Sequence, residues 1–174
     1  MRTAQSVRLV ALLCVASLFV AHRPGLSSQG MEETKSVKSL GDSKFTQIPG
    51  SPDCFQTALE NGQPEKEASI MLMKASAGCT VPWHWHISSE QIMMVRGTAR
   101  TGVRGAKPVV LQSGGFLLVP PHHVMQFACV SACTLFVYTG GPFEIHYVNE
   151  KGDEIPPDEA LKVTKEKSRR PKPR

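Results

Sequence analysis

Residues 78–97 read GCTVPWHWHISSEQIMMVRG, and this stretch sets His84 and His86 one residue apart with Glu90 shortly after them. On a β-strand, side chains alternate between two faces, so His84 and His86 point the same way and Trp85 points the opposite way. A turn through 87–89 would bring the Glu90 carboxylate to the start of the next strand, facing the same interior. Two imidazoles and one carboxylate on one side of a hairpin predict a metal site with open coordination positions.

The spacing of these residues resembles the first motif of the cupin superfamily, G-x5-H-x-H-x3,4-E-x6-G. Here the motif is filled by Gly78, His84, His86, Glu90 and Gly97. The chain is therefore similar to the small, single-domain type-2 cupins of bacterial kind that carry a signal peptide. The resemblance implies an all-β double-stranded β-helix, a jelly-roll barrel with a metal ion inside it.

An all-β fold is also indicated by the pattern of short apolar or alternating runs separated by turn residues. The runs are ASIMLMKA (68–75), CTVPWHWH (79–86), EQIMMVRGTARTGV (90–103), KPVVLQ (107–112), GFLLVP (115–120), HVMQFACV (123–130), CTLFVYTG (133–140) and PFEIHYVN (142–149). About eight antiparallel strands favour a sandwich or jelly roll. A short C-terminal helix is expected within 154–167, with Asp158 as its N-cap.

The second motif of the family, G-x5-P-x-G-x2-H, is only partly present in GGFLLVPPHHVMQF (114–127). Gly114 and Pro120 fit the motif. His122 stands at its second glycine, and Met125 stands where the family has a third metal-binding histidine. The resemblance therefore implies a ligand set reduced to two histidines and one glutamate.

Three interpretations of this reduced site are open. The two-histidine, one-carboxylate set is sufficient for Fe(II) and suits Zn or Mn, with water at the remaining positions. Alternatively, His123 compensates, since it lies two residues before Met125 and would face the same interior, although it would need a shift of roughly 6–7 Å along the strand. In the third interpretation Met125 is itself a ligand, which would favour copper; its alternative role is core packing.

The two ends of the chain differ from the middle. Arg2 and Arg8 precede the apolar run 9–21, which predicts a signal peptide cleaved after Ala21 and a secreted or periplasmic protein with no stable membrane insertion; an uncleaved N-terminal anchor is the alternative. We expect a flexible linker over 22–43, a cupin domain over 44–155 with its core at 68–148, and a basic tail over 156–174. The tail has no aromatic residues among its charges, so a solvated end is favoured over nucleic-acid binding.

Export would place the remaining cysteines in an oxidising compartment. Cys129 and Cys133 flank a three-residue link between two apolar runs, and a tight hairpin there predicts a disulfide between them. Cys54 and Cys79 would form the remaining pair. Buried free thiols are the alternative.

Trp83 and Trp85 are expected to face away from the metal, where an exposed pair would be costly. Either the segment Phe45–Phe55 covers them or they form a homodimer interface. Met71, Met73 and Met94 are expected to pack in the apolar core and pocket wall. His146 is expected to be a solvated or hydrogen-bonded histidine without a ligand role.

These features predict a metal-dependent enzyme acting on a small organic molecule with apolar parts, either a dioxygenase or an isomerase. The cofactor would be a divalent ion, with Fe, Mn or Zn favoured and Cu as an alternative. A non-catalytic ligand-binding or sensing protein and a copper-handling protein remain as alternatives, because a fold alone does not select a function.

Overall fold

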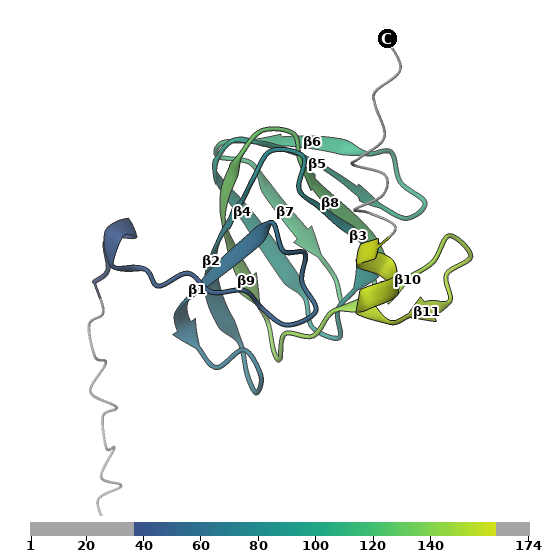
Figure 1. Cartoon of the computed structure of the whole chain (residues 1–174), viewed down its shortest axis with the longest axis horizontal. Helices are drawn as coiled ribbons and strands as arrows, with labels where there is room; N and C mark the ends of the chain where they lie inside the picture. Colours follow the sequence, from purple (N-terminus) through teal and green to yellow (C-terminus); the bar gives the residue numbers. More distant parts are fainter. Residues whose placement is uncertain (1–36, 163–174) are drawn as a thin grey trace, which may run out of the picture. The chain divides into compact units, whose positions relative to one another are not determined.

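The computed structural model describes residues 37–162, which form two antiparallel sheets around one core (Figure 1). The five-stranded sheet has the order β1 (Phe55–Gly62), β2 (Ser69–Ala75), β9 (Cys133–Thr139), β4 (Glu90–Arg96), β7 (Phe116–Val119). The six-stranded sheet has the order β11 (Glu154–Ile155), β10 (His146–Val148), β3 (Thr80–Trp85), β8 (Met125–Cys129), β5 (Thr98–Val103), β6 (Val109–Gln112). A short 3-10 helix, η1 (Leu40–Asp42), precedes them, and 157–162 are helical.

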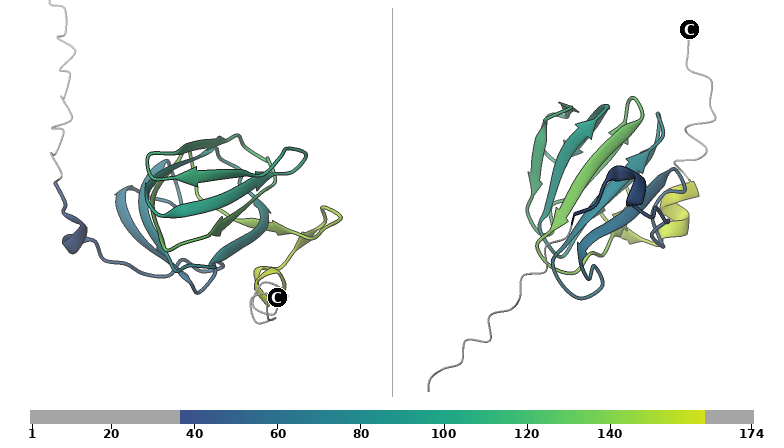
Figure 2. Two further views of the ribbon diagram at one scale, coloured as in Figure 1. Left: turned by 90° about the horizontal axis from the view of Figure 1, so that it is seen from above. Right: turned by 90° about the vertical axis from the view of Figure 1, so that its left-hand side faces the viewer.

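Consecutive strands pass repeatedly from one sheet to the other, which gives the jelly-roll arrangement expected from the sequence. The view from above in Figure 2 shows the strands enclosing an interior, with the β10–β11 hairpin extending from one side. Inward-facing side chains of both sheets fill this interior, as the strict alternation of buried and partly exposed residues along β9 illustrates.

Two boundaries differ from the sequence prediction. The run 90–103 is split into β4 and β5 at Gly97, which has a φ of 95°. The link between β8 and β9 passes so close to Gly97 that an added Cβ would be 2.2 Å from the Ala132 carbonyl oxygen. The C-terminal helix begins at residue 157, so Asp158 lies in its first turn and is not the N-cap; its carboxylate pairs with Lys162.

The predicted disulfide between Cys129 and Cys133 is wrong. Both thiols are free and buried, and the disulfide joins Cys54 to Cys79 with a Cα–Cα distance of 5.7 Å. The prediction assumed a hairpin, but β8 and β9 belong to different sheets, so the link between them crosses from one sheet to the other.

The segment before β1 lies across one end of the barrel, and we call residues 46–54 the strap. Thr46 bridges to Thr57 on β1, the Tyr147 hydroxyl donates to the Gly50 carbonyl at 2.9 Å, and the disulfide fixes the C-terminal end of the strap at Cys54. The strap is therefore attached to both sheets.

The predicted signal peptide, most of the predicted linker and most of the basic tail lie outside the described residues. Within 37–162, no helix is long and apolar enough to cross a bilayer.

Candidate metal centre

His84 is directed inward by an irregularity in β3. Val81 pairs with Phe127 and His84 pairs with Met125, so β3 carries one more residue than β8 in this interval. The extra residue forms a bulge between Val81 and His84, an interval that contains Pro82, which cannot donate a ladder hydrogen bond. Because the bulge reverses the alternation, Val81 and His84 both line the interior. The His84 Nδ1 contacts the Pro82 carbonyl at 2.7 Å, which leaves Nε2 directed into the pocket.

His86 and Glu90 flank the turn that follows β3. His86 lies just beyond the strand, where its Nδ1 donates to the Glu144 carbonyl and its ring packs at 5.1 Å from the ring of Phe143. Glu90 is the first residue of β4. The sequence predicted that the three side chains lie on one hairpin, and this is wrong. β3 and β4 lie in different sheets, and the turn between them carries the chain from one sheet to the other.

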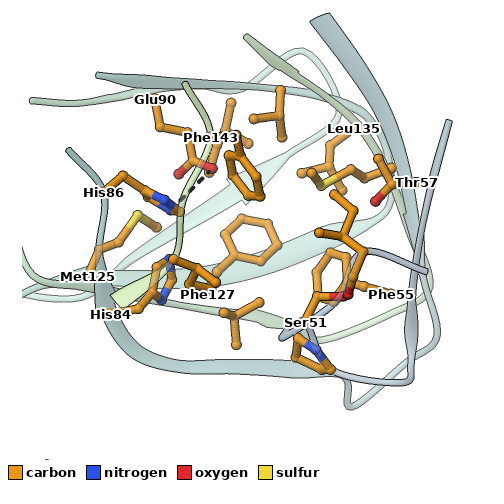
Figure 3. Close-up of a pocket in the computed structure, with 17 residues that line it drawn as sticks. Ser51, Phe55, Thr57, His84, His86, Glu90, Met125, Phe127, Leu135 and Phe143 are labelled. Carbon is orange, nitrogen blue, oxygen red and sulfur yellow. Dashed lines mark hydrogen bonds and ion pairs between the residues drawn. The ribbon is translucent and has the colours of Figure 1, made fainter. Parts of the chain in front are cut away.

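The three side chains meet inside the barrel (Figure 3). One potential ligand atom from each of His84, His86 and Glu90 lies within 4.8 Å of the others, and His86 Nε2 is 3.8 Å from a Glu90 oxygen. All three side chains are buried, with residue exposures of 3–6%. The spacing in the sequence therefore predicted which residues converge.

Burial controls the ionisation of this group in the metal-free protein. Desolvation, together with the neighbouring His86, lowers the pKa of His84 to about 3, although its hydrogen bond to Pro82 opposes the shift. Desolvation raises the pKa of Glu90, and attraction to His86 only partly offsets this. His84 is therefore neutral at physiological pH, which is the form that binds metal ions.

The donor set fits a divalent metal ion. Among the described residues, His86 Nε2 and Glu90 Oε2 are buried polar atoms without a hydrogen-bond partner. Buried polar groups are almost always paired, so two orphaned acceptors on neighbouring side chains need a cation or a proton to satisfy them. Two imidazoles and a carboxylate are ligands for Zn, Fe(II) and Mn, and they leave coordination positions open.

The pocket beside the three side chains holds about 570 Å³ of space, its open mouth included. Its wall is almost entirely apolar, and the only other polar side chains are the hydroxyls of Ser51 and Thr57. Figure 3 shows His84, His86 and Glu90 on one side of the pocket, with Ser51, Phe55 and Thr57 on the opposite side. The remaining lining residues are Ile48, Pro52, Met73, Val81, Ile92, Met125, Phe127, Leu135, Val137, Phe143 and Ile145.

The two additional ligand candidates differ. Met125 is fully buried, opposite His84 in the strand register, and lines the pocket. His123 is exposed and precedes β8, with its Nδ1 near the Pro121 carbonyl at 3.1 Å, so the expectation that it faces the interior is wrong. The strand alternation begins only at Met125, because the chain turns at His122, whose φ is 61°.

Trp83 and Trp85 on β3 are partly buried against neighbours that the sequence did not indicate. His146 stacks on Trp85 with ring centroids 4.0 Å apart, and the Arg104 guanidinium lies 5.5 Å from the centre of the Trp83 ring. His146 is itself bound by Glu154 at 2.7 Å and by Glu144 at 3.2 Å, as expected for a hydrogen-bonded histidine.

Sequence reasoning missed the strap as part of the pocket. Ile48, Ser51 and Pro52 reach the wall from a segment without strand periodicity, and Phe143 and Ile145 reach it from the loop before β10. Only the distances between segments remote in sequence reveal these contacts, so no local pattern could have indicated them.

No protein-family model and no curated protein matches the sequence. Solved structures do match. An RmlC-like cupin from Shewanella frigidimarina is 19% identical with a TM-score of 0.53, covering 63% of this chain and 93% of its own. An RmlC-like cupin protein from Ralstonia eutropha is 18% identical with a TM-score of 0.56, covering 79% and 92%. A proposed acetylacetone dioxygenase from Methylibium petroleiphilum is 16% identical with a TM-score of 0.56, covering 70% and 85%.

At these identities the likeness concerns the fold alone. The chain has the jelly-roll fold of the cupin superfamily.

Proposed function

We propose that this protein is an exported metalloenzyme, an oxygenase that acts on a small and largely apolar organic molecule. The observation that carries the proposal is the pair of buried, unpartnered atoms, His86 Nε2 and Glu90 Oε2, at one side of an apolar pocket. A structural role alone does not account for a buried carboxylate without a hydrogen-bond partner on one of its oxygens.

The bound metal ion would supply Lewis acidity and open coordination positions for substrate and oxygen. His84 and His86 would hold the ion through Nε2, because their Nδ1 atoms are engaged by the carbonyls of Pro82 and Glu144. Glu90 would contribute the single negative charge. Phe143 and Phe127 would exclude water from the reacting groups.

The proposed acetylacetone dioxygenase among the structural neighbours supports an oxygenase over other cupin activities. That description belongs to the neighbour, and it also guides the choice of assay. Small diketones are accordingly a reasonable first panel of substrates.

One observation favours a second candidate function, copper handling. Met125 is fully buried in the pocket wall opposite His84, and a thioether beside two imidazoles is a suitable environment for Cu(I). A copper-handling protein would retain copper in preference to iron and would not consume oxygen with organic substrates.

Export is supported by the basic and apolar character of 1–21 and by the Cys54–Cys79 disulfide, which is typical of oxidising compartments. N-terminal sequencing of the protein recovered from outside the cytoplasm should give a start near residue 22. An intact residue 1 on the recovered protein would contradict export by a cleaved signal.

Metal analysis of the protein purified without added ions tests the main proposal, followed by oxygen-uptake assays of the iron-loaded form. Bound iron or manganese and substrate-dependent oxygen uptake are expected, and both should be lost in Glu90→Gln. Stoichiometric copper without oxygen uptake would favour copper handling, and the absence of affinity for any metal would leave a ligand-binding protein.

A further inference from the structure

The charge of the pocket defines the class of ligand that it can hold. Among the residues that line it, Glu90 is the only one with an acidic side chain, and none is a lysine or an arginine. A divalent ion on two neutral imidazoles and one carboxylate has a net charge of +1. Because the rest of the wall is apolar, any charge that a ligand brings beyond a single negative charge remains without a partner.

We propose that the pocket selects ligands in which a single negative charge is shared by two oxygen atoms close enough to bind one metal ion. The rest of such a ligand is neutral and apolar. This inference rests on the proposed metal site. A monoanion of this kind neutralises the site, whereas a dianion leaves a buried net charge of −1 and a neutral molecule leaves +1. Enolates of 1,3-dicarbonyls and hydroxyketone anions belong to this class, and dicarboxylates do not.

The position of the polar groups supports binding of such a ligand with its oxygen atoms toward the metal ligands and its apolar part toward the opposite wall. Figure 3 places the donors and Met125 on one side, and the rings of Phe55 and Phe127 border the space beyond them. The Ser51 hydroxyl donates to the Ile48 carbonyl at 2.6 Å, so it is already engaged. The Thr57 hydroxyl, in a residue that is 6% exposed, is a neutral group that cannot balance a second anion.

Binding to the zinc-loaded protein tests the inference without turnover, because zinc has no redox chemistry. The probes are tropolone, a monoanionic oxygen chelator, and oxalate, a dianionic one, measured by isothermal titration calorimetry. We expect the preference for tropolone over oxalate to exceed that of aqueous zinc at least tenfold. We also expect 4-isopropyltropolone to bind at least fivefold tighter than tropolone, because its added carbons enter the apolar wall.

A charge introduced at the pocket wall provides the matched pair of variants. Ile48 is only partly buried and lies on the strap, so Ile48→Lys should be tolerated. The added cation should lower the preference for tropolone over oxalate at least fivefold. Ile48→Met, which has a similar stem without the charge, should leave this preference unchanged.

The outcomes separate the two proposals. Zinc that stays bound with a tropolone preference no greater than that of aqueous zinc would overturn the inference and leave the metal site intact. A preference that responds equally to Ile48→Lys and Ile48→Met would also overturn it. Failure to retain zinc, with or without tropolone, would overturn the inference together with the proposed function.

Discussion

Glu90 combines a structural cost with a proposed functional role. Its side chain is buried, and desolvation raises its pKa above the ordinary value of 4.5 in the metal-free protein. A buried carboxyl group of this kind stabilises the folded protein in its neutral form. This contribution to the unfolding free energy is lost as the pH rises from 4.5 through the folded-state pKa. Above that pH the metal-free protein contains a buried carboxylate that it cannot pair fully.

Glu90→Gln should therefore stabilise the metal-free protein while weakening metal binding. The gain in unfolding free energy should be about 1–2 kcal/mol at neutral pH and should vanish at low pH, where Glu90 is protonated. Zinc affinity should fall at least tenfold. Urea denaturation at several pH values and zinc titration measure the two effects. A variant that retains zinc affinity within twofold would show that Glu90 is not a ligand.

Met125 occupies the position at which the second cupin motif has a histidine. Because Met125 is fully buried in the pocket wall, Met125→His should place a third imidazole near the other donors and tighten zinc binding at least tenfold. The metal-free variant should lose about 1–3 kcal/mol, since a polar ring replaces an apolar side chain.

Met125→Leu is the matched control, and calorimetric zinc titration is the measurement for both variants. If the sulfur only packs, Met125→Leu leaves zinc affinity unchanged. Unchanged affinity in Met125→His would contradict the alignment of residue 125 with the histidine of the second motif.

At the scale of elements, local patterns predicted the strands better than their partners. The alternation in β9 and the common direction of His84 and His86 follow from side-chain periodicity, which the sequence contains directly, whereas the bulge in β3 determines that this direction is inward. The sheet to which each strand belongs depends on contacts between remote segments. This is why the sequence predicts a hairpin between Cys129 and Cys133 and does not predict the bulge between Val81 and His84.

The strap depends on the disulfide that ends it. Removing the bond with Cys54→Ser/Cys79→Ser frees a loop closed across a sequence separation of 25 residues, so the unfolding free energy should fall by about 3 kcal/mol. Ligand affinity should fall as well, because Ile48, Ser51 and Pro52 line the pocket.

Guanidinium denaturation with and without reductant measures this loss. Reductant should destabilise the wild-type protein to the level of the double variant and should leave the double variant unchanged. Equal stability of the oxidised wild type and the double variant would contradict a stabilising role of the bond.

The β10–β11 hairpin contains an independent titrating group. Desolvation lowers the pKa of His146, but hydrogen bonds and charge attraction from Glu154 and Glu144 outweigh it, so the pKa is raised above 6.5. The His146 ring also stacks on the Trp85 ring, which in turn lies 5.0 Å from the ring of His122. A raised histidine pKa adds stability that is complete below pH 6.5 and is lost as the pH rises through the folded-state value.

Glu154→Gln should move the pKa of His146 down toward 6.5, because it removes the carboxylate at Nδ1. The NMR titration of the His146 ring measures this shift. Glu150→Gln, at an exposed position outside the pair of contacts, should leave the titration unchanged. An unchanged midpoint in Glu154→Gln would show that Glu154 does not hold the ring in solution.

At the scale of the whole molecule, the proposed metal ion would join the two sheets. His84 belongs to β3 of the six-stranded sheet and Glu90 to β4 of the five-stranded sheet, so a single ion would connect them across the turn. A ligand that binds only the folded state stabilises it by mass action. A bridge between sheets should therefore protect both of them and not only the β3–β4 turn.

Zinc at about one hundred times its dissociation constant should raise the unfolding free energy by about 2.7 kcal/mol and the melting temperature by roughly 5–10 °C. Hydrogen exchange should slow in β3 and β4 alike, and further along each sheet, because both strands lose their independent opening. At the same zinc concentration Glu90→Gln should gain at most about 1.4 kcal/mol, since its affinity is at least tenfold weaker, and its exchange should slow correspondingly less. An equal shift in melting temperature in Glu90→Gln would place the stabilising zinc elsewhere, and protection confined to the turn would show that the ion does not couple the sheets.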